Sequence, residues 1–332
     1  MDTVRCSAPG RCGIIGNPTD MYGGAVISCT VPFRARVSVS PCERLILETG
    51  GQSLEILSDD DLRLQGDYFD VARAVLDYMR DDALTCRISY SSEIPIGSGV
   101  SSSTALTVAI LYGLLRFRHI EYSPYRVAEL ARYTELNHLR IICGYQDAYM
   151  CTFGGLNYMD FRGKAFYREA AEELYATIEP LAPFVPRVPL LVAHTGVVHS
   201  SDSVHRPLRE RWLEGDREVR QGYEEITRLA QEGKRALLLA DWDRLGRLMN
   251  ENHAIQRDLG GSGDENERLI QLALGHGALG AKLAGAGGGG TIIALHPEPQ
   301  ALAEALLEDG VELVFEPRPV RGASLDEDPW DR

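Results

Sequence analysis

The chain has 332 residues, 44% of them hydrophobic, which suffices for two domains of ordinary size and excludes wholesale disorder. Its formal net charge is −14, and such a surface repels nucleic acid and anionic lipid, so neither is expected as a partner. No signal peptide or membrane-spanning run is found, and seven scattered cysteines without a C-x-x-C pair favour buried free thiols, so a cytoplasmic protein is expected.

The first half of the chain predicts strands and helices in mixed order. Residues 25–57 are rich in Val, Ile and Thr with partial alternation, which is typical of an antiparallel sheet. The patterns that follow are a helix at 70–80, a strand at 84–92, a buried helix at 103–118, and a helix at 123–139 with Ser123 as its N-cap. The segment 143–161 is predicted to be rich in turns and to end in a strand.

Four prolines within residues 180–189 mark the predicted domain boundary. It divides the chain into an N-terminal domain, 1–185, a C-terminal domain, 186–325, and a flexible tail, 326–332, with fraying expected from residue 322. The patterns after the boundary are strand 190–196, helix 218–238, helix 241–256, a glycine-rich loop entering a strand within 280–295, helix 299–310 and strand 311–320. Because the predicted strands and helices are mixed without strict β-α-β alternation, the sequence favours the α+β class.

A glycine- and serine-rich connection, "PIGSGVSSST", joins a predicted strand to a predicted helix at residues 95–104. Unpaired N–H groups at a helix N-terminus attract phosphate oxygens, and glycines allow a backbone to approach a ligand closely. One of the hydroxyls could bind Mg²⁺ beside a phosphate. This is no Walker loop, because no G-K-[ST] follows. A capped helix start with a flexible entry stays open as an alternative.

Two further stretches point to a site. Five of the six residues at 285–290 are glycine, and the entropy lost on ordering them is easier to explain if the loop approaches a ligand. A tight turn is the alternative. The segment 7–24, "SAPGRCGIIGNPTDMYGG", offers the cation Arg11 and the carboxylate Asp20 in a predicted turn, where a solvated surface carboxylate is the alternative. Two glycine-rich loops in one chain favour a nucleotide site.

Taken in the order of the chain, the three stretches resemble the three motifs of the GHMP small-molecule kinases, which include galactokinase, homoserine kinase, mevalonate kinase and phosphomevalonate kinase. "APGRCGIIGNPTD" is similar to motif one, "PIGSGVSSSTA" to motif two and "KLAGAGGGG" to motif three. Ser101 departs from motif two, because the family usually has glycine there. The resemblance implies a two-domain α+β fold, with a ribosomal-S5-domain-2-like N-terminal domain and a ferredoxin-like C-terminal domain. It also implies ATP and Mg²⁺ at their junction.

The resemblance further implies residue roles. Asp147 would be the general base, and Arg11 would hold that carboxylate ionised and offset charge on the transferring phosphoryl group. Ser103 and Glu135 would be the Mg²⁺ ligands. The implied nucleotide contacts are Pro95, Gly97, Ser98, Gly99, Val100, Ser101, Ser102, Ser103, Thr104, Gly285, Ala286, Gly287 and Gly288. An exposed helix carboxylate at position 135 and a turn cap at position 147 are the alternatives.

Within the family the likeness is to glucuronokinases, carried by "GIIGNPTDMYGG", "GYQDAYMCTFGGLNYMDF" and "VHRPLRERWLEGD". It implies an ATP-dependent kinase for a hydroxyl of a sugar or sugar acid, with the anomeric hydroxyl of glucuronate as the first guess. Arg11 favours a sugar, because mevalonate kinases usually have lysine there. The implied substrate contacts are Asn17, Asp20, Tyr22, Gly144, Gln146 and Arg206. Candidate cations for a uronate carboxylate are His199, His205, Arg206 and Arg209, with a solvated helix face as the alternative.

Other activities stay open at this point. The third motif is more like that of heptose-phosphate kinases, so a heptose-phosphate or mevalonate-type kinase is an alternative. A decarboxylase and a non-catalytic ligand-binding regulator exist on the same fold, although the presence of both Arg11 and Asp147 argues against a regulator. A monomer or a homodimer is expected.

Overall fold

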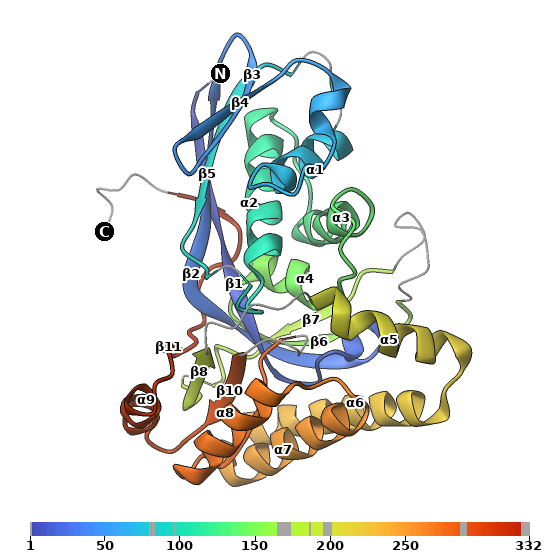
Figure 1. Cartoon of the computed structure of the whole chain (residues 1–332), viewed down its shortest axis with the longest axis vertical. Coiled ribbons are helices and arrows are strands. Elements are labelled where there is room, and N and C mark those ends of the chain that lie inside the picture. Colours follow the sequence, from blue (N-terminus) through green and yellow to red (C-terminus); the bar gives the residue numbers. More distant parts are fainter. Residues whose placement is uncertain are drawn as a thin grey trace.

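The computed structural model describes residues 2–79, 81, 84–95, 97–164, 174–185, 187–194, 201–285 and 291–326, with the backbone alone at 201–205. Over these residues the chain forms two β-sheets and the helices that cover them (Figure 1). Both sheets are antiparallel apart from one parallel pairing in the first. The predicted α+β class is therefore confirmed.

The first sheet is built on two long strands, β1 (Val4–Ile15) and β2 (Ala25–Pro41). Its order is β12-β1-β2-β5-β3-β4, and β6 and β7 extend it from the first half of β2. The shorter strands are β3 (Leu45–Thr49), β4 (Gln52–Ile56), β5 (Cys86–Ser92), β6 (Leu156–Asp160), β7 (Thr177–Pro180) and β12 (Ser324–Leu325). The strands predicted within 25–57 are thus present.

One face of the first sheet carries α2 (Ser102–Phe117), an apolar helix that packs along β1 and β2 (Figure 1). Beside it lie α1 (Asp70–Met79), α3 (Pro124–Asn137) and α4 (Gln146–Phe153). The Ser123 hydroxyl accepts a hydrogen bond from the Arg126 N–H at 3.3 Å, which confirms the predicted N-cap of α3. All seven cysteines are free and five are buried, as predicted.

The second sheet has the order β11-β8-β10-β9, and helices α8 and α9 pack on it. Helix α6 packs against β1, β2 and α7, and α7 lies against both β9 and β1, so α7 joins the two sheets. The bounds are α5 (Ser201–Glu214), α6 (Arg217–Leu238), α7 (Trp242–Asp258), α8 (Asp264–Gly275), α9 (Pro299–Glu308), β8 (Leu190–His194), β9 (Gly280–Leu283), β10 (Thr291–Leu295) and β11 (Leu313–Phe315).

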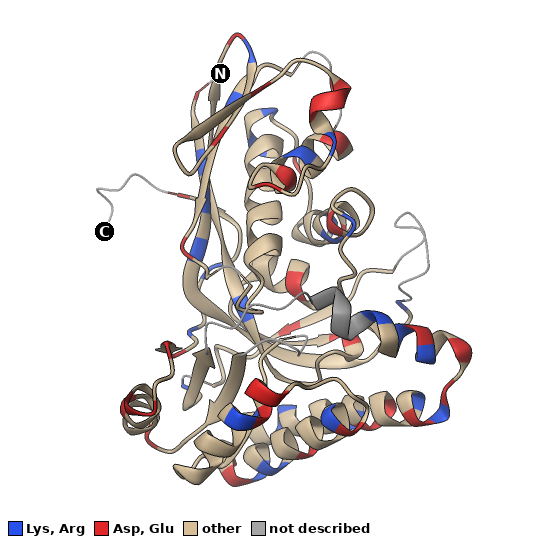
Figure 2. Ribbon diagram, in the orientation of Figure 1, with Lys and Arg blue, Asp and Glu red and all other residues tan. Residues whose placement is uncertain are grey.

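Acidic and basic residues alternate along α6 and α7 (Figure 2). Arg228, for example, forms ion pairs with Glu225 and Glu232 one turn away on either side. Such pairs are typical of a solvated helix face. Of the helices described, none has the length and hydropathy needed to cross a bilayer.

Two local predictions near the site are wrong in part. Within residues 7–24 the first half, up to Ile15, is strand, because two register shifts, at Pro9/Arg11 and Gly13/Ile15, let glycine and proline sit within the β1 ladder. The second half, which contains Asp20, forms turns and a short 3-10 helix. The turn predicted within 143–161 contains helix α4 instead. Helix α8 and strand β9 were not predicted.

The predicted fraying from residue 322 is also wrong for the residues described. Ser324 and Leu325 pair with β1, and the Asp326 N–H donates to the Arg5 carbonyl at 2.9 Å. Ala323 donates to the Thr152 carbonyl at 3.1 Å, at the end of α4. The chain passes from the first sheet to the second between residues 180 and 190, but this last segment returns to the first sheet. The domain limits stay a prediction.

Candidate active site

The three glycine-rich segments, which are far apart in the sequence, meet around one cavity of about 510 Å³. The Arg11 N–H donates to the Val100 carbonyl at 3.1 Å, and the Gly13 N–H donates to the Ala284 carbonyl at 2.8 Å. Strand β1 is therefore bonded both to the loop before α2 and to the segment that follows β9.

Glycine is required at two of these close approaches. A Cβ atom at Gly10 would lie 2.4 Å from the Val100 carbonyl oxygen, and one at Gly285 would lie 2.5 Å from the Gly99 carbonyl oxygen. Real Cβ atoms do not come this close to backbone oxygens, so a side chain at either position would push the segments apart.

The loop before α2 has three residues in the left-handed region: Gly97 (φ 69°), Gly99 (φ 71°) and Ser101 (φ 67°). Glycine adopts this conformation without strain, which explains why Ser101 is the unusual residue of the loop. Ser101 is 8% exposed, and its Oγ atom has no hydrogen-bond partner in the part of the chain described.

Six residues of this loop line the cavity: Gly97, Gly99, Ser101, Ser102, Ser103 and Thr104. The other predicted contacts of the loop do not line it, since the Ser98 hydroxyl donates to the Pro95 carbonyl at 2.7 Å and Val100 is fully buried. Gly285 lines the cavity, whereas residues 286–288 (Ala286, Gly287, Gly288) lie outside the described residues.

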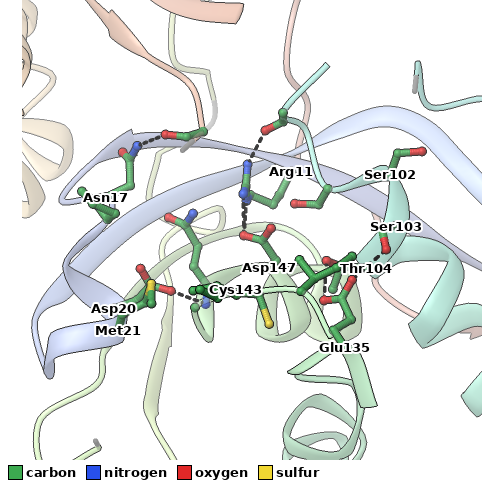
Figure 3. Close-up of a pocket in the computed structure, with 18 of the residues that line it drawn as sticks. Arg11, Asn17, Asp20, Met21, Ser102, Ser103, Thr104, Glu135, Cys143 and Asp147 are labelled. Atoms are coloured by element: carbon green, nitrogen blue, oxygen red, sulfur yellow. Dashed lines mark hydrogen bonds and ion pairs between the residues drawn. The ribbon is translucent and has the colours of Figure 1, made fainter. Parts of the chain in front are cut away.

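Glu135 projects from α3 toward the first turn of α2 (Figure 3). The Ser103 hydroxyl donates to its Oε1 at 2.9 Å and the Thr104 hydroxyl to its Oε2 at 2.8 Å. The residue is 2% exposed, which rules out an exposed helix carboxylate, and this burial raises the pKa of Glu135 to about 7. Hydroxyl and carboxylate oxygens are the ligands that Mg²⁺ prefers, so Ser103 and Glu135 fit such an ion.

Asp147 lies in the first turn of α4 and faces Arg11 on β1 (Figure 3). The Arg11 Nε and Nη2 atoms lie 2.7 and 2.5 Å from Oδ1, and Nη1 donates to the Gly99 carbonyl at 2.8 Å. Burial disfavours the charge on Arg11, but the contact with Asp147 outweighs burial and raises its pKa. One guanidinium thus joins the Oδ1 atom of this carboxylate to the glycine-rich loop, and Asp147 lines the cavity.

Asp20 lies in a short 3-10 helix (Thr19–Tyr22) and is 4% exposed, so it is no solvated surface carboxylate. Its Oδ2 accepts hydrogen bonds from the N–H groups of Tyr145 at 2.7 Å and Gln146 at 2.9 Å. Burial raises the pKa of Asp20 to about 6. A Cβ atom at Gly144 would lie 1.9 Å from Oδ2, so only glycine fits there. Asp20 caps the helix that carries Asp147.

Asn17 and Gln146 also line the cavity. The Asn17 amide donates to the Gly285 carbonyl at 3.0 Å and accepts from the Lys282 ammonium at 2.6 Å. Lys282 is 1% exposed, and burial lowers its pKa to about 7. It was not predicted, although its place at the start of "KLAGAGGGG" was the available indication. Gln146 accepts from the Ser28 hydroxyl at 2.8 Å.

Two predicted substrate contacts do not line the cavity. Tyr22 packs on Tyr223 and Trp212, with ring centroids 4.6 and 5.2 Å apart, and Arg206 is exposed on α5. His199 and the side chain of His205 lie outside the described residues.

Sequence reasoning also missed a cavity-lining cation, Arg140. The sequence did offer one indication of it, since this basic residue lies between the predicted metal ligand Glu135 and the predicted base Asp147. Among the described residues lining the cavity, it is the cation without a carboxylate partner.

Comparisons with known proteins agree with this geometry. The family model "GHMP kinases N terminal domain" matches residues 69–155, "GHMP kinases C terminal" matches 234–310, and the "Galactokinase galactose-binding signature" matches 2–41. One similar solved structure is the mevalonate kinase of Methanococcus jannaschii, with a TM-score of 0.75 and 19% identity, covering 96% of this chain and 99% of that chain. Another is the galactokinase of Lactococcus lactis complexed with galactose, with a TM-score of 0.75 and 17% identity, covering 97% of this chain and 95% of that chain.

Curated relatives span almost the whole chain. Glucuronokinase 1 of Arabidopsis thaliana is 29% identical over 94% of this chain and 90% of its own, and probable glucuronokinase 2 of the same plant is 30% identical over 94% and 89%. The mevalonate kinase of Thermococcus sibiricus is 29% identical over 90% of each chain. The chain belongs to the GHMP kinase family, and it is a phosphotransferase with an alcohol group as acceptor.

Proposed function

We propose that the protein transfers the γ-phosphoryl group of ATP to a hydroxyl of a sugar or sugar acid, with the anomeric hydroxyl of glucuronate as the first candidate. The observation that carries the proposal is the Arg11–Asp147 pair, which lies between the loop at 97–104 and the Asp20 carboxylate in one cavity. The glucuronokinase relatives support the sugar acid, and the galactose-binding signature, which matches β1 and β2, supports a sugar.

The loop at 97–104 would hold the triphosphate. Its three left-handed residues turn the backbone ahead of α2, a helix of 16 residues whose first N–H groups have no partner within the helix. Gly285 faces the same cavity, and the proposed contacts extend to Ala286, Gly287 and Gly288. Ser103 and Glu135 would hold Mg²⁺, which when bound neutralises charge on the phosphate oxygens.

Asp147 would accept the proton of the acceptor hydroxyl through Oδ2 while that oxygen attacks the γ-phosphorus and the bond to the departing ADP oxygen breaks. Arg11 keeps Oδ1 engaged and stabilises the negative charge that spreads over the phosphoryl oxygens. Asn17, Asp20, Gly144 and Gln146 border the acceptor's side of the cavity. Catalysis of this kind is mostly positioning and electrostatics.

A panel of acceptors tests the proposal. ADP release is measured with Mg²⁺ and ATP in the presence of glucuronate, galacturonate, glucose, galactose, mevalonate and a heptose phosphate. We expect the highest kcat/KM with glucuronate. A preference for mevalonate would show that the proposed substrate is wrong and the proposed reaction is right. ADP release that does not depend on any acceptor would contradict phosphoryl transfer to an alcohol.

A further inference from the structure

Arg140 occupies an uncommon place in the cavity wall. It follows the end of α3, between Glu135 and Asp147, and it lines the same cavity as both. The next residue, Ile141, donates its N–H to the Glu135 carbonyl at 2.9 Å, so the backbone at this turn is fixed to the helix that carries the proposed metal ligand.

The backbone of Arg140 is left-handed, with φ 59°. Glycine or asparagine usually fills such a position after a helix, because the Cβ atom of other residues is crowded there. His119 and Ala240 have the same conformation just after the ends of α2 and α6, so the backbone alone does not distinguish Arg140. What distinguishes Arg140 is that a cationic side chain stands at such a position in the cavity wall.

The positive charge of Arg140 has no partner among the described residues. The described residues that line the cavity include three carboxylates, Asp20, Glu135 and Asp147, and two arginines. The Arg11 guanidinium is engaged by Asp147 and by the Gly99 carbonyl. Arg140 forms no ion pair or side-chain hydrogen bond within the described part of the chain, and it is an exposed residue that lines the cavity. In a chain of net charge −14, an anionic acceptor requires such a cation.

We infer that Arg140 binds the carboxylate of a hydroxy-acid acceptor and makes the site select acids over neutral sugars. The inference rests on the proposed phosphoryl transfer. A guanidinium matches a carboxylate with two parallel hydrogen bonds, which gives both affinity and orientation. Arg140 lies in the sequence between Glu135, on the proposed metal's side, and Gly144, on the acceptor's side, so the test separates a contact with the acceptor from a contact with the triphosphate.

The test compares Arg140→Gln and Arg140→Lys with wild type on acid and neutral sugars of the same stereochemistry, glucuronate with glucose and galacturonate with galactose. We expect Arg140→Gln to raise the KM for glucuronate about ten- to a hundredfold, the loss typical of a charged hydrogen bond. Arg140→Lys should lose less, because it keeps the charge. The KM for ATP and the kcat/KM for glucose should change by no more than about twofold in either variant.

Arg247→Gln is the matched control, because Arg247 is exposed on α7 and does not line the cavity. It removes the same charge and should leave every constant unchanged. An unchanged KM for glucuronate in Arg140→Gln would overturn the inference, and so would an equal rise in the KM for ATP.

The failure of the proposed function has a different signature. If wild type phosphorylates mevalonate and not glucuronate, the proposed substrate is wrong, and the same comparison is made with mevalonate, which is also a hydroxy acid. If wild type accepts only neutral sugars, the inference is overturned while phosphoryl transfer stands. Calorimetric titration of glucuronate into protein loaded with a non-hydrolysable ATP analogue measures the affinity for the acceptor without turnover. Equal affinity in wild type and Arg140→Gln would overturn the inference.

Discussion

The loop at 97–104 and the acceptor wall, formed by Asp20, Gly144, Gln146 and Asp147, border one cavity but are built in different ways. The loop is shaped by its own left-handed backbone and by glycines that allow close contact with β1 and with Gly285. The wall depends on buried side chains, above all on Asp20, which caps α4 from 126 residues away. Nucleotide binding should therefore depend mainly on the backbone, and acceptor chemistry on individual side chains.

Replacing Asp147 should separate the two regions most sharply. Asp147→Asn removes the proton acceptor and leaves the loop intact, so kcat should fall about a hundred- to ten-thousandfold while ATP still binds. Steady-state ADP release and calorimetric titration with ATP measure the two quantities. Asp258→Asn is the control, because this side chain is 68% exposed on α7. Near-normal turnover in Asp147→Asn would remove Asp147 from the mechanism.

The buried carboxylate of the wall should appear in the pH dependence of stability. Burial raises the pKa of Asp20 to about 6 from an ordinary value of 3.8, so the folded state keeps its proton at a pH where the unfolded chain has lost it. The contribution of Asp20 to stability is therefore largest below pH 4 and is lost as pH rises to 6, by at most about 1.4 kcal/mol per pH unit.

Asp20→Asn should remove this slope, because asparagine can still accept hydrogen bonds at the start of α4 but does not titrate. Urea unfolding of both proteins at pH 4, 5, 6 and 7 measures the difference. A constant difference in the free energy of unfolding from pH 4 to 7 would contradict the raised pKa.

The smallest effect is expected in the loop. Ser101→Gly relieves a left-handed serine and removes a buried hydroxyl without a partner, so it should raise the free energy of unfolding by roughly 1 kcal/mol. Because the loop acts through its backbone, the KM for ATP should stay within about twofold. Ser102→Gly, one residue later in α2, should instead destabilise by about 1 kcal/mol. A tenfold rise in the KM for ATP in Ser101→Gly would show that the hydroxyl itself contacts the nucleotide.

These two regions also differ in how far the sequence predicts them. The strand, loop and helix around residues 84–118 follow one another in the chain, so local patterns sufficed for them. Helix α4 was not predicted because the backbone N–H groups at its start are hydrogen-bonded by Asp20, and no local sequence pattern shows this distant contact. Strand β1 escaped because its bulges place glycine and proline where turns are expected. Arg140 escaped because its importance depends on which neighbouring charges are already paired.

Helix α4 is held at both ends by remote segments. Asp20 caps its first turn, while Ala323 donates to the Thr152 carbonyl and Gly154 forms a bridge with Arg321 at its last turn. The helix that carries the proposed base is thus fastened by residues near the beginning and near the end of the chain. During synthesis, the loop at 97–104 can form on the ribosome long before residues 321–323 emerge. The nucleotide's half of the cavity also needs Gly285, and the fastening of α4 needs residues 321–323, so the acceptor's half is fixed in place only near the end of synthesis.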